Sequence, residues 1–304
     1  MNSLDEIAAN LCVVFPHFTA IMPLRLLGSG FRSVVVETGD GIVFRIAKNQ
    51  EAANGYAREA RLLPYLRPRV LIAVPDPRWL AGPSEHFPFG VMGYPKLPGT
   101  PLSPERLARA DVSRLASDIA RFLLALHRIP VEEVTALGLP GSAVCMKELD
   151  VTRDAVLPPL RDALTNTEYD TVRRWWEQFL ADETMRAYKP ALQHGDFWHE
   201  NMLVDDTSRS LLGVVDFENA AVGDPAQDVA TQLHLGDAFA AQVIDAYRTL
   251  GGTLDATFDY RTRRLWELRV FDGLAFAVRH ADSAEFDDAV RKLREGPILN
   301  PRVA

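Results

Sequence analysis

The fold of this 304-residue chain is decided by the stretch His194-Gly195-Asp196-Phe197-Trp198-His199-Glu200-Asn201, which is followed by Val214-Val215-Asp216-Phe217. Asn201 lies five positions after Asp196, so a tight loop can turn both side chains toward one pocket. The apolar run Leu211 to Val215 predicts a buried strand that delivers Asp216 at its end. The two segments therefore predict one site that gathers three polar side chains.

These three side chains suit phosphoryl transfer, in which a protein mainly positions two substrates and neutralises charge. Such a site needs a carboxylate that orients the attacking hydroxyl, for which Asp196 is the catalytic candidate. It also needs oxygen ligands for the magnesium ions that bridge the nucleotide phosphates, and Asn201 and Asp216 are the candidates. The same order of Asp, Asn and Asp is a signature of protein kinases.

With these motifs the chain resembles the aminoglycoside phosphotransferase family, a kinase-like group that includes antibiotic-resistance enzymes, macrolide phosphotransferases, and choline and homoserine kinases. Two segments are most similar to the aminoglycoside 2''-phosphotransferases, namely Lys96 to Gly99 and Ala120 to His127. The resemblance implies an α+β, two-lobed protein-kinase-like fold with a small β-rich nucleotide lobe and a larger, mainly helical lobe. Further matching segments are Leu27 to Gly30, Phe44 to Ile46, Glu59, Pro88 to Gly90, Pro98 to Leu102, Asp224-Pro225 and Asp228.

A glycine-rich turn, Gly28-Ser29-Gly30, precedes the apolar run Val34 to Val36. Glycines let backbone amides approach phosphates, because no Cβ stands in the way. A short turn of this kind alone more often has only a structural role, but the downstream loop favours nucleotide binding. The chain lacks the G-x-x-x-x-G-K-[ST] motif of P-loop enzymes.

Arg45 stands where kinases of this type usually carry a lysine that holds the phosphates and pairs with a helix glutamate, here Glu59. Arginine keeps the charge and binds phosphate through a planar fork, so the exchange is not neutral. Lys48 is the alternative, but it should face the opposite side of an extended strand. A surface ion pair between Arg45 and Glu59 is the other interpretation.

The neighbouring histidines and aspartates have structural interpretations. We expect His194 to pack and hydrogen-bond so that it fixes the catalytic loop, and Asp228 to stabilise the same loop. His199 faces either solvent or the phosphates. Asp224 either caps the following helix or faces the substrate. A histidine metal site is disfavoured because magnesium prefers oxygen ligands.

The acceptor and the base of the donor must be recognised by other residues. Polycationic aminoglycosides need carboxylates, and the candidates are Glu218, Asp224, Asp237, Glu267 and Asp272, with Trp266 as a stacking wall. The segments near Trp175 and Trp266 equally suit an apolar pocket for a macrolide. Gly93 and Tyr94 precede the connector expected to contact the purine, so either GTP or ATP is the expected donor.

Periodicity predicts the lobes. Leu4 to Leu11 has helical spacing; Ser33 to Glu37 and Gly41 to Ala47 predict a hairpin, and Glu51 to Leu66 a helix. A strand pair is expected at Val70 to Val74 and Phe89 to Tyr94. The proline-rich segment after Tyr94 divides a nucleotide-binding lobe, residues 1–94, from a catalytic and substrate-binding lobe, residues 95–304. Apolar positions in the second lobe, at residues 115–126, 175–180 and 226–294, have helical spacing.

Composition excludes several classes of partner. A net charge of -8 argues against nucleic acid and anionic membranes. Cys12 and Cys145 match no metal motif and are expected to be reduced thiols. The chain does not begin with a basic segment followed by an apolar run, and it has no apolar run of about 18 residues. We therefore expect a cytoplasmic protein. We also expect a monomer.

Together these features predict a small-molecule kinase that transfers the γ-phosphate of GTP or ATP to a hydroxyl of an aminoglycoside antibiotic, which would confer resistance. Two alternatives stay open. One is a kinase for another small alcohol, such as a macrolide, choline or homoserine. The other is a catalytically silent nucleotide-binding protein, which Arg45 makes conceivable but the joint presence of Asp196, Asn201 and Asp216 disfavours.

Overall fold

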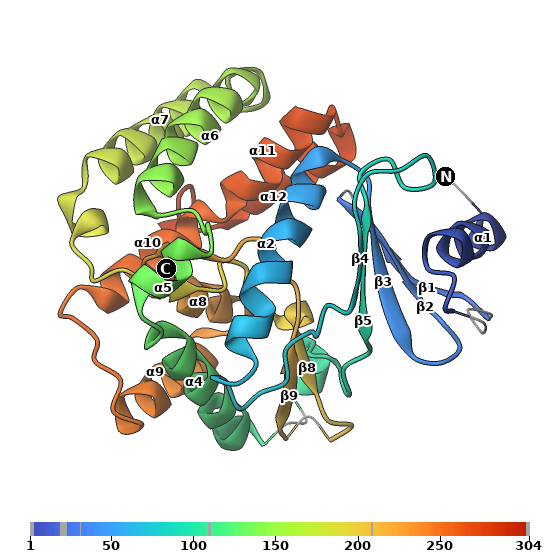
Figure 1. Cartoon of the computed structure of the whole chain (residues 1–304). Helices are drawn as coiled ribbons and strands as arrows, with labels where there is room; N and C mark the ends of the chain where they lie inside the picture. The colour runs from blue at the N-terminus through green and yellow to red at the C-terminus, as the bar shows by residue number, and fades with distance from the viewer. Residues whose placement is uncertain (1–2, 19–22, 31, 109–110, 208, 302–304) are drawn as a thin grey trace.

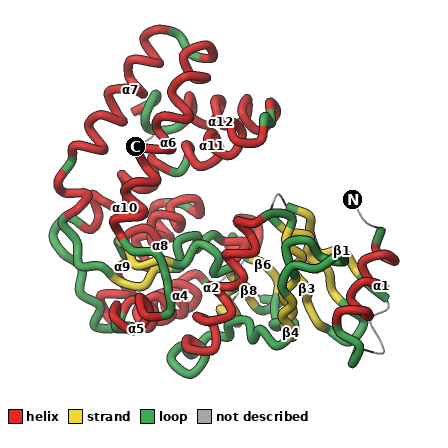
Figure 2. Tube along the Cα trace, turned by 45° about the horizontal axis from the view of Figure 1, so that its top comes forward, coloured by secondary structure: helices red, strands yellow, loops and turns green. Residues whose placement is uncertain are grey.

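The expected division into a strand-rich part and a helical part is present in the computed structural model, which describes residues 3–18, 23–30, 32–108, 111–207 and 209–301. An antiparallel sheet lies at one end and most helices lie at the other (Figure 1). Figure 2 shows the same separation, with the strands of the sheet together and the larger helices beyond α2.

The sheet has the strand order β1-β2-β3-β5-β4, and each neighbouring pair is antiparallel. The expected hairpin joins the second and third strands, where Gly41 has φ +78° and donates from its N–H to the carbonyl of Thr38 at 3.0 Å. Glycine adopts this left-handed conformation without steric cost. The strands are β1 Arg25–Ser29, β2 Ser33–Glu37, β3 Ile42–Ala47, β4 Trp79–Ala81 and β5 Val91–Pro95.

Each face of the sheet is covered by one helix. Helix α1, Leu4–Val14, packs against the face that contains Phe44, and helix α2, Gln50–Leu66, packs against the face that contains Val43 and Ala47. Because side chains alternate along a strand, Arg45 shares the α2 face with Val43 and Ala47. This alternation brings Arg45 to the helix that carries Glu59.

The prediction of a strand at residues 70–74 is wrong. Residues 70–74 do not join the sheet; instead β4 pairs with β5, and Ala73 forms an isolated parallel bridge with Gly213. Val70 and Val74 are apolar because they pack into the core of the helical part. A short apolar run that enters another core has the same sequence pattern as a buried strand.

The helical part is built around α4 and α9, which pack against each other. Eight buried side chains line α4, as its apolar spacing predicts. Two small sheets, β10-β7 and β6-β8-β9, lie beside this core. The elements are β6 Thr100–Pro101, α3 Pro104–Leu107, α4 Val112–His127, α5 Val131–Ala136, β7 Ala191–Gln193, η2 His199–Asn201, β8 Met202–Val204, β9 Leu211–Val214, β10 Ala221–Gly223, α8 Ala226–Ala230, η3 Thr231–Leu235 and α9 Asp237–Thr249.

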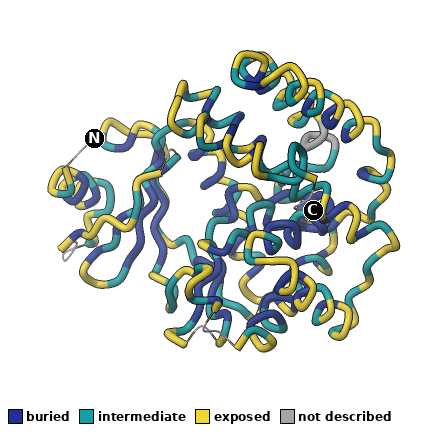
Figure 3. Tube along the Cα trace, turned by 180° about the vertical axis from the view of Figure 1, so that it is seen from behind, coloured by how far each residue is buried: buried dark blue, intermediate teal, exposed yellow. Residues whose placement is uncertain are grey.

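A second cluster joins the remaining helices around Trp175, Trp176 and Phe271. Trp175 and Trp176 are both buried there, so they do not line an open pocket. Figure 3 shows buried segments in the sheet and through the middle of the helical part. These helices are α6 Ser142–Ala163, α7 Asn166–Ala181, η1 Glu183–Arg186, α10 Phe258–Leu268, α11 Val270–His280 and α12 Ser283–Glu295.

Three sequence predictions concern properties of the whole chain. Among the described residues, no helix is long and apolar enough to span a bilayer. Cys12 is a free, exposed thiol, and the side chain of Cys145 lies outside the described part of the chain. The five strands of the large sheet all fall within residues 25–95, and the division at residue 94 stays our proposed lobe boundary.

Candidate active site

The loop between β7 and β8 holds Asp196 and Asn201 in one turn. The Asn201 side-chain amide donates to the carbonyl of Asp196 at 3.0 Å, and the carbonyl of Asn201 accepts from the N–H of Val215 at 3.0 Å. The second contact ties the loop to the chain just before Asp216. Asn201 is therefore hydrogen-bonded both to Asp196 and to Val215, the residue before Asp216.

Asp228 anchors this loop from the core. Its fully buried carboxylate accepts from the N–H groups of His194 and Gly195, each at 2.9 Å, and lies 3.2 Å from Nε2 of His127. Gly195 has φ +81°, and a Cβ there would lie 2.2 Å from the carbonyl oxygen of Asn219. No other residue type fits at position 195.

His194 is fully buried, and its Nε2 lies 3.0 Å from the carbonyl oxygen of Val215. These contacts agree with the structural role that we predicted for His194 and Asp228. His199 is also buried, and its ring stacks on that of His234 with centroids 4.9 Å apart. His199 therefore does not face open solvent.

Asp216 follows β9 in a left-handed conformation, with φ +67°. This conformation is rare for residues other than glycine and asparagine, and it turns the carboxylate toward Arg45, whose Nη2 lies 3.0 Å away. The side chain is 43% exposed, so the carboxylate is partly open to a ligand. Burial on its own would raise the pKa of Asp216, but the charge of Arg45 outweighs it and holds that pKa below its usual range.

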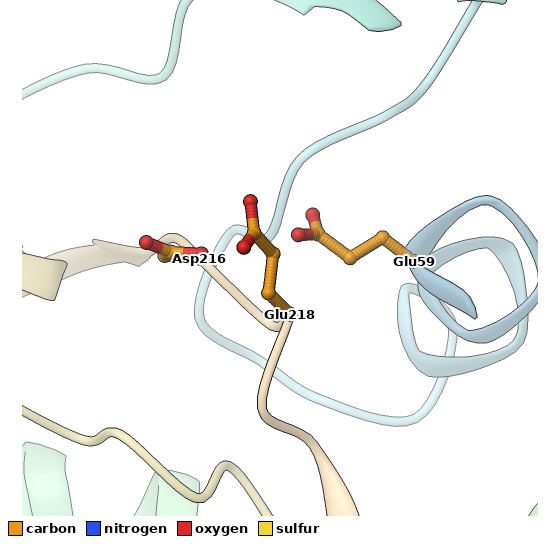
Figure 4. Close-up of side chains that lie close together, drawn as sticks. All are labelled: Glu59, Asp216 and Glu218. Atoms are coloured by element: carbon orange, nitrogen blue, oxygen red, sulfur yellow. The ribbon is translucent and has the colours of Figure 1, made fainter. Parts of the chain in front are cut away.

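Arg45 lies among three carboxylates. Its Nη1 donates to Glu59 at 2.8 Å, and its Nη2 contacts both Asp216 and Glu218. The three acidic groups lie within 4.8 Å of one another, and Figure 4 shows Glu59 and Glu218 directed toward each other. The single guanidinium offsets part of the negative charge of this cluster.

Burial is the largest influence on the pKa values of Glu59 and Glu218. It raises the pKa of Glu59 to about 8, although Arg45 opposes the shift. It also raises the pKa of Glu218, again against Arg45. Glu59 Oε2 is buried without a hydrogen-bond partner among the described residues. The pair of Arg45 and Glu59 is thus a buried interaction and not a surface ion pair.

The glycine-rich turn lies at the end of β1. A Cβ added at Gly28 or Gly30 would meet no atom within 4 Å among the described residues beyond its chain neighbours. The Lys48 ammonium donates to Ser29 Oγ at 2.9 Å and to the carbonyl of Gly30 at 2.5 Å. Lys48 was expected to face away from the site, but β3 ends at Ala47, so strand alternation no longer applies to it.

Gly93 and Tyr94 belong to β5. A Cβ at Gly93 would lie 2.4 Å from the ring of Phe44, so tight packing requires a glycine here. Tyr94 is 6% exposed and packs with Tyr56 and Met92 on the α2 side of the sheet. Burial raises the pKa of Tyr94. The roles of Gly93 and Tyr94 in nucleotide binding remain predictions.

The carboxylates that the sequence assigned to the acceptor each have an arginine partner in the structure. Glu218 is buried against Arg45, and Asp224 is buried against Arg261, whose Nε lies 2.6 Å away. Asp224 also accepts from the N–H of Ala226, which is the capping role considered for it.

The other three acidic candidates are paired as well. Glu267 accepts from Trp175 Nε1 at 2.7 Å and contacts Arg264. Asp237 lies on the exposed side of α9, 3.3 Å from Arg263. Asp272 is exposed and lies 3.9 Å from Arg269. Asp237 and Asp272 are largely exposed, and the role of these residues in acceptor binding remains a prediction.

Sequence reasoning missed Arg269, which reaches the catalytic loop. Its Nη2 lies 3.1 Å from Asp196 Oδ1, and its guanidinium lies over the ring of Trp198, 5.1 Å from the centroid. Trp198 in turn packs on His234, and Trp266 lies beside His234 with centroids 6.2 Å apart. No local motif marks Arg269; only the tertiary fold brings it to Asp196.

The chain is similar to known phosphotransferases in sequence and in fold. The sequence profile of the phosphotransferase enzyme family matches residues 23–266. Viomycin phosphotransferase from Streptomyces vinaceus is 25% identical over 203 residues, which cover 66% of this chain and 68% of that protein.

Two solved structures share the fold. The GDP and kanamycin complex of APH(2'')-IIIa has a TM-score of 0.84 at 24% identity, covering 94% of this chain and 96% of that chain. Macrolide 2'-phosphotransferase MphH from Brachybacterium faecium has a TM-score of 0.71 at 24% identity, covering 96% and 98%. The expected kinase-like α+β fold is confirmed.

Proposed function

Because this chain belongs to the phosphotransferase enzyme family, we propose that it transfers the γ-phosphate of a nucleoside triphosphate to a hydroxyl group of a small molecule. One observation carries the proposal: hydrogen bonds join Asn201 to Asp196 and to Val215, the residue before Asp216, and Arg45 from the other lobe reaches Asp216. This is the set of groups that phosphoryl transfer needs.

The proposed metal is magnesium, held by Asn201 and Asp216. An amide oxygen and a half-exposed carboxylate fit its preference for oxygen ligands. A bound magnesium ion would neutralise charge on the phosphates that it bridges. In this proposal Arg45 adds positive charge from the nucleotide lobe, and the buried Glu59 fixes its direction.

Asp196 is the proposed catalytic residue. Arg269 binds Oδ1 of its carboxylate, so Oδ2 is the oxygen that we assign to the acceptor hydroxyl. In this position Asp196 orients the hydroxyl and takes its proton as the phosphate is transferred. Asp228 acts indirectly, because it holds the loop and does not reach the substrate.

The proposed donor is GTP or ATP, bound between the turn Gly28 to Gly30 and the segment that contains Gly93 and Tyr94. A relative of known structure was solved with GDP, which supports nucleotide binding at this fold position. We expect a cytoplasmic monomer, since both substrates are small molecules.

The acceptor that we propose first is an aminoglycoside. The sequence resemblance and the kanamycin complex of a structural relative support this class. The paired carboxylates and Arg269 favour a second candidate, an acceptor with fewer positive charges, such as a macrolide or another small alcohol. The macrolide phosphotransferase with the same fold supports that alternative.

A panel assay tests the proposal. Purified protein, magnesium and either GTP or ATP are incubated with kanamycin, gentamicin, erythromycin, choline or homoserine, and both nucleotide consumption and the phosphorylated product are measured. Product formation that is lost in Asp196→Asn supports the proposal. Nucleotide binding without a phosphorylated product across a wide panel would favour the catalytically silent alternative.

A further inference from the structure

Glu218 stands two residues after the proposed magnesium ligand Asp216, and both carboxylates contact the same nitrogen of Arg45. Its side chain is directed into the cluster, between Asp216 and Glu59 (Figure 4). Only 4% of the residue is exposed, whereas the Asp216 side chain is 43% exposed. Of the two carboxylates on Arg45 Nη2, Glu218 is therefore buried, and Asp216 is accessible to a ligand.

The nucleotide lobe fixes Glu218 from several sides. A Cβ on Gly55 of α2 would lie 3.0 Å from Glu218 Cγ, so the helix backbone packs directly on this side chain. Arg58 donates to the Glu218 carbonyl at 2.9 Å, and Arg32 Nη1 lies 3.4 Å from Glu218 Oε2. Such contacts hold the Glu218 carboxylate against Arg45.

The role of Glu218 follows from the Arg45 nitrogen that it shares with Asp216. Nη1 of Arg45 binds Glu59, so Glu218 and Asp216 are the partners of Nη2. In a Glu218→Gln variant, Asp216 would be the only carboxylate at Nη2. A charge-assisted hydrogen bond to one carboxylate is stronger than one shared between two. Arg45 would then compete directly with magnesium for Asp216.

We propose that Glu218 is a positioning residue that occupies Arg45 and so leaves Asp216 available to magnesium. This inference rests on the proposed function, because it assumes that Asp216 binds the metal of a nucleotide complex. It also explains how arginine fits at position 45. Its planar fork needs a carboxylate at each end, and Glu59 and Glu218 supply them.

The experiment measures how nucleotide binding depends on magnesium. A fluorescent GDP or ADP analogue, whichever binds the parent more tightly, is titrated with magnesium in the parent, Glu218→Gln, Arg45→Lys and the double variant. We expect Glu218→Gln to raise the half-saturating magnesium concentration by roughly tenfold, the effect of strengthening one charged hydrogen bond. In the lysine background the same substitution should change it by less than about threefold.

The lysine background separates competition from simple loss of charge, because both backgrounds lose the same negative charge. Equal shifts in both, or no shift in either, would overturn the inference. Asp224→Asn is the matched control, since it also removes a buried carboxylate paired with an arginine. It should leave the magnesium dependence unchanged while thermal unfolding confirms that all variants are folded.

The proposed function and the role of Glu218 are tested by different outcomes. A parent protein that binds no nucleotide even in saturating magnesium would overturn both proposals. A parent that binds the magnesium-nucleotide complex, but whose Glu218→Gln variant has the same magnesium dependence, would overturn only the role of Glu218.

Discussion

Arg269 binds the catalytic candidate Asp196 directly: its Nη2 lies 3.1 Å from Oδ1, and its guanidinium rests over Trp198. A fixed positive charge at this place repels an acceptor that carries an ammonium group beside the reacting hydroxyl. At an effective dielectric constant of about 20, two like charges roughly 5 Å apart repel by about 3 kcal/mol before screening by salt. The acceptor preference should therefore depend on Arg269.

Replacing Arg269 by glutamine should shift this preference toward cationic acceptors. Kanamycin and its N-acetylated form offer the same hydroxyls with and without charge. We expect the ratio of kcat/KM for the charged form over the acetylated form to rise by about tenfold in Arg269→Gln. Arg263→Gln is the control, because Arg263 pairs with Asp237 on exposed α9. A ratio that stays constant in Arg269→Gln would assign Arg269 to loop positioning alone.

Asp196→Asn should nearly abolish turnover and leave the donor site intact. The amide keeps the shape of the side chain and an oxygen for Arg269, but it cannot accept the hydroxyl proton. Loss of general-base assistance is worth roughly a hundredfold or more in kcat. Steady-state kinetics and nucleotide titration measure the two effects separately. Turnover within a few-fold of the parent would remove Asp196 from its proposed role.

Asp216→Asn should remove magnesium-dependent activity without unfolding the protein. Asparagine tolerates the left-handed conformation found at this position, whereas alanine would add about 1 to 2 kcal/mol of strain. The substitution therefore tests the charge alone. We expect activity to fall at least about a hundredfold, with a melting temperature close to that of the parent. Loss of the cooperative unfolding transition would show that Asp216 is mainly structural.

The sequence predicted features that depend on local spacing. Gly41 and the alternating residues on either side predicted the hairpin, and Leu115 to Leu126 predicted the core face of α4. The loop from Asp196 to Asn201 was predicted as one unit because its closing contacts lie within five residues. These features can be predicted because turn residues and the spacing of apolar residues are local properties of the sequence.

The partners of Glu218 and Arg269, which lie far away in the sequence, were not predicted. Glu218 was assigned to the acceptor, but it binds Arg45, which lies 173 positions away. Arg269 reaches Asp196 across 73 positions. The run Val70 to Val74 looked like a strand, because an apolar run does not specify which core it enters. Such pairings depend on how elements dock, and no local pattern encodes them.

Acid should weaken the attachment of α12 to α7. A hydrogen bond from Arg294, together with one from the backbone of Thr165, lowers the pKa of Glu168 from 4.5 to about 2. Because the folded pKa lies below the unfolded one, the stabilisation is complete above pH 4.5 and disappears as the pH falls toward 2. Glu168→Gln should thus melt about 2 to 4 °C below the parent at pH 7, and the gap should narrow below pH 4.

A matched control for this prediction lies on the same helix. Glu177 pairs with Arg173 on the exposed side of α7, where ion pairs contribute little. Glu177→Gln should melt within about 1 °C of the parent at either pH. An equal loss in both variants would mean that net charge, and not the contact between Glu168 and Arg294, sets the effect.

Donor choice should depend on Tyr94, which is 6% exposed on β5 just before the connector between the lobes. We expect the parent to use GTP at least as well as ATP, because in our proposal the bulky ring of Tyr94 restricts the space beside the adenine. Tyr94→Ala should shift the ratio of kcat/KM toward ATP, by an amount equivalent to about 1 to 3 kcal/mol for one misfitting group. Tyr94→Phe keeps the ring and should keep the parent's ratio, which separates ring size from the hydroxyl. Because the alanine variant also loses packing against Tyr56 and Met92, kinetics are measured below its melting temperature. Strict use of ATP by the parent, or the same ratio in Tyr94→Ala, would refute a role of Tyr94 in donor choice.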